Sequence, residues 1–356
     1  MTQASVLAQL GSAGVSQGFK NRIINGAMVI DQRNAGASVT ANDGTYSVDR
    51  WKSIATANGK FSMQQNAGSV TPPTGFTNYL GCTSTAATSV GSSDFYQLRQ
   101  VIEGFNFADC GWGTANAKTV TLSFWVRSSL TGTHGGSVFN AAGSRTYPFS
   151  FTINSANTWE FETITIAGDT TGTWVGATNG GGLQVGFNLG TGSSLSGTAN
   201  AWSGSTFMAP TGAVQIVATN GATFYITGVQ LEVGTTATEF EVRPYGTELQ
   251  LCQRYYQRID GFYAVGFNST TMSGSIGFPV EMRASPSLSV SGALETTDFV
   301  AANYTQSSGS VSISGAGARV SARGVMADFG NFTSITNYRV YGNLPQVNRL
   351  ILSSEL

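Results

Sequence analysis

Alternating apolar and polar residues constrain the fold of this chain more than any other feature. In TVTLSFWVRS (119–128) every second side chain is apolar, and the alternation recurs in YPFSFTI (147–153) and LQVGFNL (183–189). A period of two places one set of side chains in a core and the other set on the opposite face of a β-strand. The residues expected to face the core are Val120, Leu122, Phe124, Val126, Tyr147, Phe149, Phe151, Ile153, Leu183, Val185, Phe187 and Leu189. Turn-like stretches such as TNGGG and GTGSSLSGTAN separate these segments, which predicts an antiparallel sandwich rather than βαβ units.

The composition favours an all-β protein with more than one domain. A chain of 356 residues can bury about two or three separate cores. It has 45 glycines and only 10% charged residues, which favours short strands and turns over helical bundles. We find no repeat of fixed period, which argues against a β-helix or a propeller.

The charge balance excludes one class of partner. The chain has 18 Lys and Arg residues against 19 Asp and Glu residues, for a net charge of -1. It therefore lacks the basic surface that the phosphate backbone of a nucleic acid requires. Weak repulsion between copies is also typical of a protein that forms symmetric oligomers.

The cysteines and the apolar runs indicate where the protein is made. Cys82, Cys110 and Cys252 are odd in number and widely spaced, so we expect free buried thiols rather than disulfides or a zinc site. No apolar run reaches the ~18 residues that span a bilayer. The first residues lack the basic and apolar regions of a secretory signal. We therefore expect synthesis in a cytoplasm and no membrane insertion.

A change of periodicity after RPYG predicts a helix, ELQLCQRYYQRI (248–259). Its apolar residues form two adjacent stripes, composed of Leu249, Cys252 and Tyr256 and of Leu251, Tyr255 and Ile259. Either three copies of the helix meet at an axis, or one helix lies across an end of the sandwich. Short strands return from residue 261 onward. The expected order is an N-terminal segment (1–20), a β-sandwich (21–245), a linking helix (246–260) and a β-rich C-terminal domain (261–356).

Several motifs resemble those of bacteriophage fibre proteins. NRIINGAMVIDQR, YSVDRW, TLSFWVRS and ITGVQLEVG resemble the jelly-roll sandwiches of carbohydrate-binding modules as phage fibre proteins carry them. This resemblance covers residues 19–258, about two thirds of the chain. PVEMRASPSL, with Met282, Arg283 and Pro286, resembles an element of phage fibre C-terminal domains.

The resemblance implies a role and a set of partners. It implies a homotrimeric virion protein that is assembled in the host cytoplasm and attaches to other virion proteins through residues 1–20. The expected ligand is host cell-surface polysaccharide, and residues 261–356 are expected to form the distal end. A capsid-decorating fibre without a receptor role is an alternative.

The resemblance also implies glycan-binding residues. In related modules, aromatic rings and planar polar side chains on a concave sheet contact the sugar. Ser123, Trp125 and Arg127, on the non-core face of their strand, match that place. Gln97 and Arg99 in FYQLRQVIEG are expected on a neighbouring strand, and Tyr338 and Tyr341 near a second, distal surface. Alternatively, the residues of the sandwich pack beneath a covering loop or at a subunit contact.

The sequence offers little for catalysis. The only histidine, His134, lies in GTHGGS, which we expect to be a turn, so no histidine-based triad or metal cluster is predicted. Glu160 and Glu162 are about 7 Å apart by strand geometry, as are Glu239 and Glu241. That spacing fits glycoside hydrolysis, so a polysaccharide depolymerase is the alternative in a different class. Because any half-exposed strand can meet this criterion, we expect no enzymatic activity and no cofactor.

Three acidic residues near the start could contribute to a calcium site. Asp31, Asp43 and Asp49 lie in turn-like sequence, and calcium prefers carboxylate and carbonyl oxygens. Solvated turn carboxylates are the simpler interpretation, so no metal is predicted.

Overall fold

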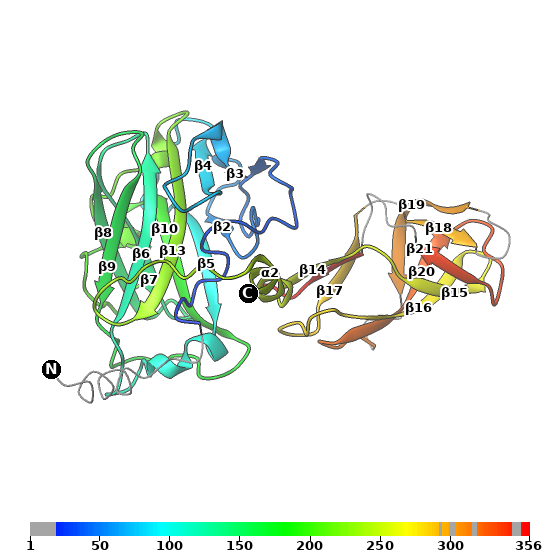
Figure 1. The fold of residues 1–356 in the computed structure, drawn as a ribbon. Coiled ribbons are helices and arrows are strands. Elements are labelled where there is room, and N and C mark those ends of the chain that lie inside the picture. Colours follow the sequence, from blue (N-terminus) through cyan, green and yellow to red (C-terminus); the bar gives the residue numbers. More distant parts are fainter. Residues whose placement is uncertain (1–18, 292–293, 299–303, 315–318, 344–349) are drawn as a thin grey trace, which may run out of the picture. The chain divides into compact units, whose positions relative to one another are not determined.

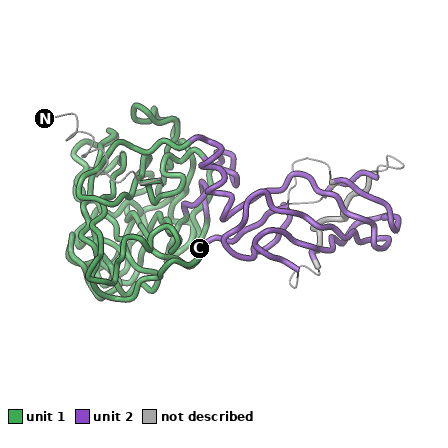
Figure 2. Tube along the Cα trace, turned by 60° about the horizontal axis from the view of Figure 1, so that its bottom comes forward, with its two compact units in different colours: residues 1–29, 38–45, 52–243 green, residues 30–37, 46–51, 244–356 purple. Residues whose placement is uncertain are grey.

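The computed structural model describes residues 19–356 except 292–293, 299–303, 315–318 and 344–349. Residues 1–18, and with them almost all of the predicted attachment segment, lie outside the described residues. The described chain forms two compact units (Figure 2). Unit 1 contains residues 19–29, 38–45 and 52–243, and unit 2 contains residues 30–37, 46–51 and 244–356. Residues 30–37 and 46–51 thus belong to unit 2, although the expected order of consecutive domains places them in the sandwich.

Unit 1 is an antiparallel sandwich of two sheets (Figure 1). The first sheet has the order β1 (Val39–Thr40), β3 (Phe61–Gln65), β4 (Leu80–Ser84), β13 (Thr223–Val233), β6 (Val120–Ser128) and β9 (Glu160–Ile166). The second has the order β2 (Lys52–Ala55), β5 (Phe95–Glu103), β10 (Gly181–Thr191), β7 (Gly132–Phe139) and β8 (Thr146–Ile153). The smaller elements are the parallel pair β11 (Ser196–Gly197) and β12 (Ala209–Pro210), and the 3-10 turns η1 (Ala67–Ser69), η2 (Gly104–Asn106), η3 (Ala108–Cys110), η4 (Ser193–Leu195) and η5 (Ile216–Ala218).

The core of unit 1 lies between the two sheets, as the alternation predicts. All twelve residues expected to face the core are buried. The ring of Phe124 on β6 lies 5.0 Å from that of Phe187 on β10 and 5.1 Å from that of Phe151 on β8, between ring centroids. The all-β, antiparallel jelly-roll prediction is confirmed.

Unit 2 is also rich in strands. Its first regular element is the helix α2 (Tyr245–Gln253), which follows the two short N-terminal segments in the chain. A three-stranded sheet has the order β14 (Tyr256–Ile259), β22 (Leu350–Ser353) and β17 (Ser287–Val290). A closed barrel contains β15 (Tyr263–Asn268), β16 (Thr271–Gly277), β20 (Gly324–Phe332), β19 (Tyr304–Ser314), β18 (Glu295–Asp298) and β21 (Val340–Asn343). No helix in the described parts of the chain is long and apolar enough to cross a bilayer.

The predicted helix is shorter than its sequence pattern suggests. It ends at Gln253, whereas the prediction extends it to Ile259. Residues Tyr256–Ile259 form β14 instead, paired with β22 from the far end of the chain. The backbone hydrogen bonds of this long-range pairing replace those of a helix, so a local pattern does not reveal the change.

A largely buried group of charged and aromatic side chains, here called the arginine cluster, lies within unit 2. It contains Arg33, Asp49, Arg50, Tyr255, Tyr256 and Glu355. Glu355 forms ion pairs with Arg50 and, at 2.5 Å, with Nη2 of Arg33. The guanidinium carbon of Arg50 lies 3.5 Å from the ring centroid of Tyr255, and that of Arg33 lies 3.6 Å from the ring centroid of Tyr256.

Three of the six predicted trimer contacts are wrong. Cys252, Tyr255 and Tyr256 are buried within one chain, so they do not form a surface for other copies. The other three predicted contact residues, Leu249, Leu251 and Ile259, keep partial exposure. The prediction that Cys82, Cys110 and Cys252 are free and buried is confirmed.

Candidate functional site

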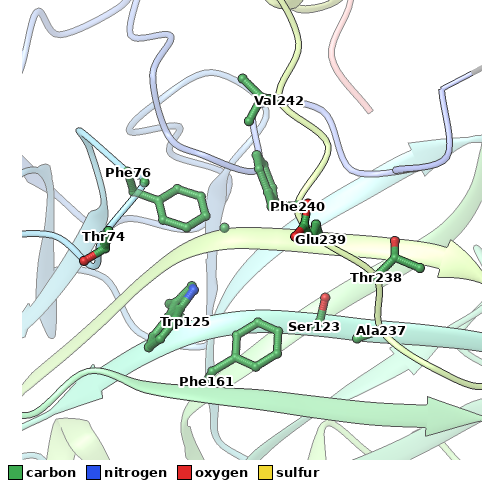
Figure 3. A pocket seen from close by; sticks show the side chains of 12 residues that line it. Thr74, Phe76, Ser123, Trp125, Phe161, Ala237, Thr238, Glu239, Phe240 and Val242 are labelled. Carbon is green, nitrogen blue, oxygen red and sulfur yellow. The ribbon is translucent and has the colours of Figure 1, made fainter.

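An aromatic groove lies on the face of the six-stranded sheet that points away from the core. Trp125 on β6 and Phe161 on β9 are cross-strand partners, and their ring centroids are 5.3 Å apart. Phe76 and Phe240, from two loops, meet edge to face above this floor at 5.1 Å (Figure 3). The groove has a volume of about 630 Å³ and is lined by Thr74, Gly75, Phe76, Ser123, Trp125, Phe161, Gly228, Ala237, Thr238, Glu239, Phe240 and Val242.

A β-bulge with a glycine allows the two aromatic pairs to approach each other. The pairing of β13 with β6 shifts register between Thr227 and Gln230, and Gly228 there has a φ of 61°. A Cβ atom on Gly228 would lie 2.6 Å from Cζ of Phe76 and 3.2 Å from Cδ1 of Trp125. Both the left-handed backbone and the close contact require glycine at this position.

One wall of the groove is the strap, residues 237–242, which buried polar side chains hold in place. The Glu232 carboxylate accepts hydrogen bonds from the backbone N–H of Thr238 at 2.8 Å and from its hydroxyl at 2.7 Å. Gln230 Oε1 accepts a hydrogen bond from the Glu241 N–H at 2.8 Å, and Glu241 Oε1 accepts one from the Lys20 N–H at 2.9 Å. These bonds fix the strap before any ligand binds.

The groove offers hydrogen-bonding groups that the protein leaves unused. Among the described residues, neither the indole N–H of Trp125 nor the hydroxyl of Ser123 has a hydrogen-bond partner. Glu239 is the only charged residue that lines the groove, and its side chain is exposed. Ser123 is only 2% exposed, so the accessible polar groups are the Trp125 donor and the Glu239 acceptor beside an apolar aromatic surface, a combination typical of a small-molecule site.

Of the glycan-binding residues predicted on the sandwich, only Ser123 and Trp125 line the groove. Arg127 points to the same face, but its Nε donates a hydrogen bond to the Asn157 carbonyl at 2.9 Å and its guanidinium lies 5.6 Å from the ring centroid of Tyr225. Arg127 therefore supports the sheet surface beside the groove.

Gln97 and Arg99 lie elsewhere, and their predicted position beside Trp125 is wrong. They are on β5, which belongs to the other sheet, and are 0% and 7% exposed. Gln97 Nε2 donates a hydrogen bond to the Met208 carbonyl at 2.6 Å, and the Arg99 guanidinium lies 4.4 Å from the ring centroid of Phe139. Burial lowers the pKa of Arg99 to about 10. The alternative interpretation, that they pack beneath a covering segment, is correct for both.

The two distal tyrosines have different environments. Tyr338 is 89% exposed, so its role in a distal surface stays a prediction. Tyr341 is 2% exposed and belongs to the core of unit 2, where its hydroxyl accepts a hydrogen bond from the Thr336 N–H at 2.8 Å. Tyr341 therefore cannot contact a ligand at the surface.

His134 is not in a turn, contrary to prediction. It lies on β7, is buried, and stacks between the rings of Phe151 and Phe224. Its Nε2 is 2.9 Å from the Leu130 carbonyl oxygen, and burial lowers its pKa. His134 thus has the environment of a neutral core residue.

The carboxylate pairs do not share the groove. Glu160 accepts hydrogen bonds from the backbone of Asn154 and Ser155. Desolvation raises the pKa of Glu160, but these hydrogen bonds outweigh it and the net shift is downward. The pKa of Glu162 is raised by partial burial and by the negative charge of Glu160. Glu239 lines the groove, but Glu241 is bonded to the chain near residue 20.

The three acidic residues considered for calcium are bonded within the protein. Asp31 accepts hydrogen bonds from the N–H groups of Asn34 and Gly36, and Asp43 accepts one from that of Ala55. Asp49 belongs to the arginine cluster. No group of three potential metal ligands occurs among the residues that the structure describes.

Sequence reasoning missed most of the groove. Phe76, Phe161 and Phe240 come from three separate regions and meet only in the folded chain, and Glu239 was considered only as part of a carboxylate pair. One signal was available, because Gly228 interrupts an otherwise strong strand pattern, and such a glycine often marks a bulge or a close approach.

No known protein family and no curated protein matches the sequence. Solved structures show a distant likeness. A domain of bacteriophage CBA120 tailspike protein 4 is 13% identical over 60% of this chain and 22% of that chain, with a TM-score of 0.32. A CBM4 structure is 15% identical over 59% and 98% of the two chains, with a TM-score of 0.30. TmCBM61 in complex with β-1,4-galactotriose is 10% identical over 61% and 100%, with a TM-score of 0.31.

These likenesses concern the fold alone. This chain spans about a fifth of the tailspike chain that it matches, 22% of its length. The sandwich of unit 1 is similar to carbohydrate-binding modules, and its own sheets define it as an antiparallel jelly roll.

Proposed function

We propose that this chain is a bacteriophage virion protein, a homotrimeric fibre that attaches to other virion proteins through residues 1–20 and binds a neutral glycan of the host surface. The aromatic groove of unit 1 is the observation that carries the glycan-binding part. The fibre part depends on the sequence motifs that resemble phage fibre proteins. Only one carboxylate lines the groove, so binding without cleavage is proposed.

The chemistry of the groove suits a sugar ring. A pyranose has an apolar face of C–H groups and a rim of hydroxyls. Trp125 and Phe161 offer an aromatic surface to the face, and the Trp125 N–H and the Glu239 carboxylate offer hydrogen bonds to the rim. Neutral partners avoid the cost of burying a charge. Single sites of this kind are weak, and three copies in one fibre raise avidity when they bind together.

Replacing Trp125 by alanine tests the proposal. We expect Trp125→Ala to weaken binding to host envelope polysaccharide by about 2 kcal/mol, roughly thirtyfold, because a central aromatic contact is removed. The fold should persist, since Trp125 lies outside the core between the sheets. Titration calorimetry with purified polysaccharide measures the change.

Two controls accompany this experiment. Tyr263→Ala removes an aromatic side chain that is 68% exposed on β15, and binding should not change. Gly228→Ala forces Phe76 away, whereas Gly221→Ala, with a φ of 75° and open space around it, imposes similar backbone strain without the clash. Only Gly228→Ala should weaken binding. Equal binding by wild type and Trp125→Ala would remove the groove from the proposal.

The homotrimer has its own test. Leu249, Leu251 and Ile259 remain partly exposed and are the proposed contacts. Light scattering should give the mass of three chains, and Leu251→Ser should shift it toward one chain. Because Tyr255 belongs to the arginine cluster, Tyr255→Ser should unfold unit 2 and is unsuitable for this experiment. A wild-type mass of one chain contradicts the trimer.

A further inference from the structure

We infer that the groove selects glycans that carry an acetamido group, such as N-acetylhexosamines, over the corresponding plain hexoses. This inference rests on the proposed glycan binding and adds the class of sugar. Three features of the groove carry it: a second aromatic pair above the floor, an unpaired donor beside that pair, and a single carboxylate at the rim (Figure 3).

The aromatic pair above the floor disfavours a plain hexose. Stacking on Trp125 and Phe161 uses one apolar face of a sugar, and the edge of the sugar carries hydroxyls. Phe76 and Phe240 offer those hydroxyls no hydrogen-bond acceptor or donor. A hydroxyl directed toward them loses its water without gaining a partner, whereas a methyl group there removes apolar surface from water.

The polar groups near this pair match the rest of an acetamido group. A Cβ placed on Gly228 would lie close to both Cζ of Phe76 and Cδ1 of Trp125, so the Cδ1 edge of the indole, which carries the adjacent N–H, faces the Phe76 side. That N–H has no partner among the described residues and can donate to an acetamido carbonyl. A methyl group beyond the carbonyl then reaches the Phe76 and Phe240 rings.

Glu239 supplies the remaining complement. Its carboxylate can accept a hydrogen bond from the acetamido N–H, and it is the only charge on the groove lining. A negative charge at the rim also opposes uronic and sialic acids, because like charges repel. A 6-deoxysugar has a methyl group but lacks the acetamido carbonyl and the acetamido N–H. It therefore contacts only the aromatic part of the site.

The test compares matched sugars on the full-length protein. Titration calorimetry is performed with N,N′,N″-triacetylchitotriose and cellotriose, which differ at the acetamido positions, and with the matched N-acetylgalactosamine and galactose. We expect at least tenfold tighter binding of the acetylated member of each pair. Trp125→Phe keeps an aromatic floor but loses the N–H, and should reduce the preference to less than about threefold.

A matched variant controls for the loss of an indole elsewhere. Trp202→Phe makes the same chemical change at a tryptophan that does not line the groove and whose N–H donates to the Ala167 carbonyl at 2.8 Å. Its preference should equal that of wild type. Equal affinity of wild type for both members of each pair, or a full preference in Trp125→Phe, would overturn the inference.

Host polysaccharide separates failure of the inference from failure of the proposed function. Native polysaccharide is titrated beside the four sugars. Binding of native polysaccharide together with equal affinity for both members of each sugar pair overturns the acetamido preference and leaves glycan binding intact. If neither native polysaccharide nor any of the four sugars binds, the proposed function fails together with the inference.

Discussion

Replacing Arg50 by alanine is expected to lower the free energy of unfolding of unit 2 by about 3–5 kcal/mol, the cost of breaking a buried ion pair by removing one partner. Arg50 is 2% exposed and pairs with Glu355, and its guanidinium carbon lies 3.5 Å from the ring centroid of Tyr255. Without Arg50, Tyr255 loses a cation–π partner and the Glu355 carboxylate loses one of its two ion pairs, keeping the one with Arg33. Calorimetric unfolding of the purified protein measures the loss.

A second arginine of unit 2 provides the control. Arg323 pairs with Glu281 at 3.1 Å, but the two side chains are 80% and 53% exposed. Exposed pairs contribute little, so Arg323→Ala should cost less than about 1 kcal/mol. Arg50→Lys keeps the charge but not the planar group, and should have an intermediate effect. Similar losses for Arg50→Ala and Arg323→Ala would show that the arginine cluster does not stabilise unit 2.

The second large effect is a pH dependence that Asp49 confers on unit 2. Burial raises the pKa of Asp49 to about 7, against the attraction of Arg33 and a hydrogen bond from Gln32. The folded state therefore binds the Asp49 proton more tightly than the unfolded state. This contribution to stability is fully present below a pH of about 4 and is lost as the pH rises to about 7.

The size of this effect follows from the two pKa values. A carboxyl with a pKa of 3.8 when exposed and about 7 when folded changes the free energy of unfolding by about 4 kcal/mol over that range, at about 1.4 kcal/mol per pKa unit. Between pH 5 and pH 8, the free energy of unfolding of wild-type unit 2 should fall by roughly 3 kcal/mol more than that of the Asp49→Asn variant. Thermal unfolding at several pH values gives both curves.

Asp43→Asn is the matched control for this pH series. It changes an exposed carboxylate that is near in sequence but belongs to unit 1, where it accepts a hydrogen bond from the Ala55 N–H. Its pH profile should follow that of wild type. Parallel profiles for wild type and Asp49→Asn would contradict a proton on Asp49 in the folded state.

Strands and core residues were predictable because alternation is a local property. The three alternating segments became β6, β8 and β10, and their apolar residues fill the sandwich core. The same patterns could not assign a strand to a sheet. Alternation shows which side of a strand faces a core, but both sheets of a sandwich share that core.

That ambiguity accounts for the misplaced Gln97 and Arg99, whereas two other errors have their own causes. Gln97 and Arg99, like Trp125, point away from the core between the sheets, but they do so from β5 of the opposite sheet. Tyr341, expected near a distal surface, belongs instead to the buried core of unit 2. His134 was assigned to a turn because its flanking glycines are typical of turns, although they permit close packing in β7.

The sequence by itself determined the all-β class, the alternation that fills the sandwich core, the free thiols and the outward position of Trp125. Each of these depends on residues that are near one another in the chain. Only the tertiary structure decided that Phe76, Phe161 and Phe240 surround Trp125, and that Arg50 meets Glu355 from the other end of the chain. These contacts depend on strand order, on the bulge at Gly228 and on long-range strand pairing. They could not be predicted, because packing between two distant segments leaves no periodic signal in the sequence of either segment.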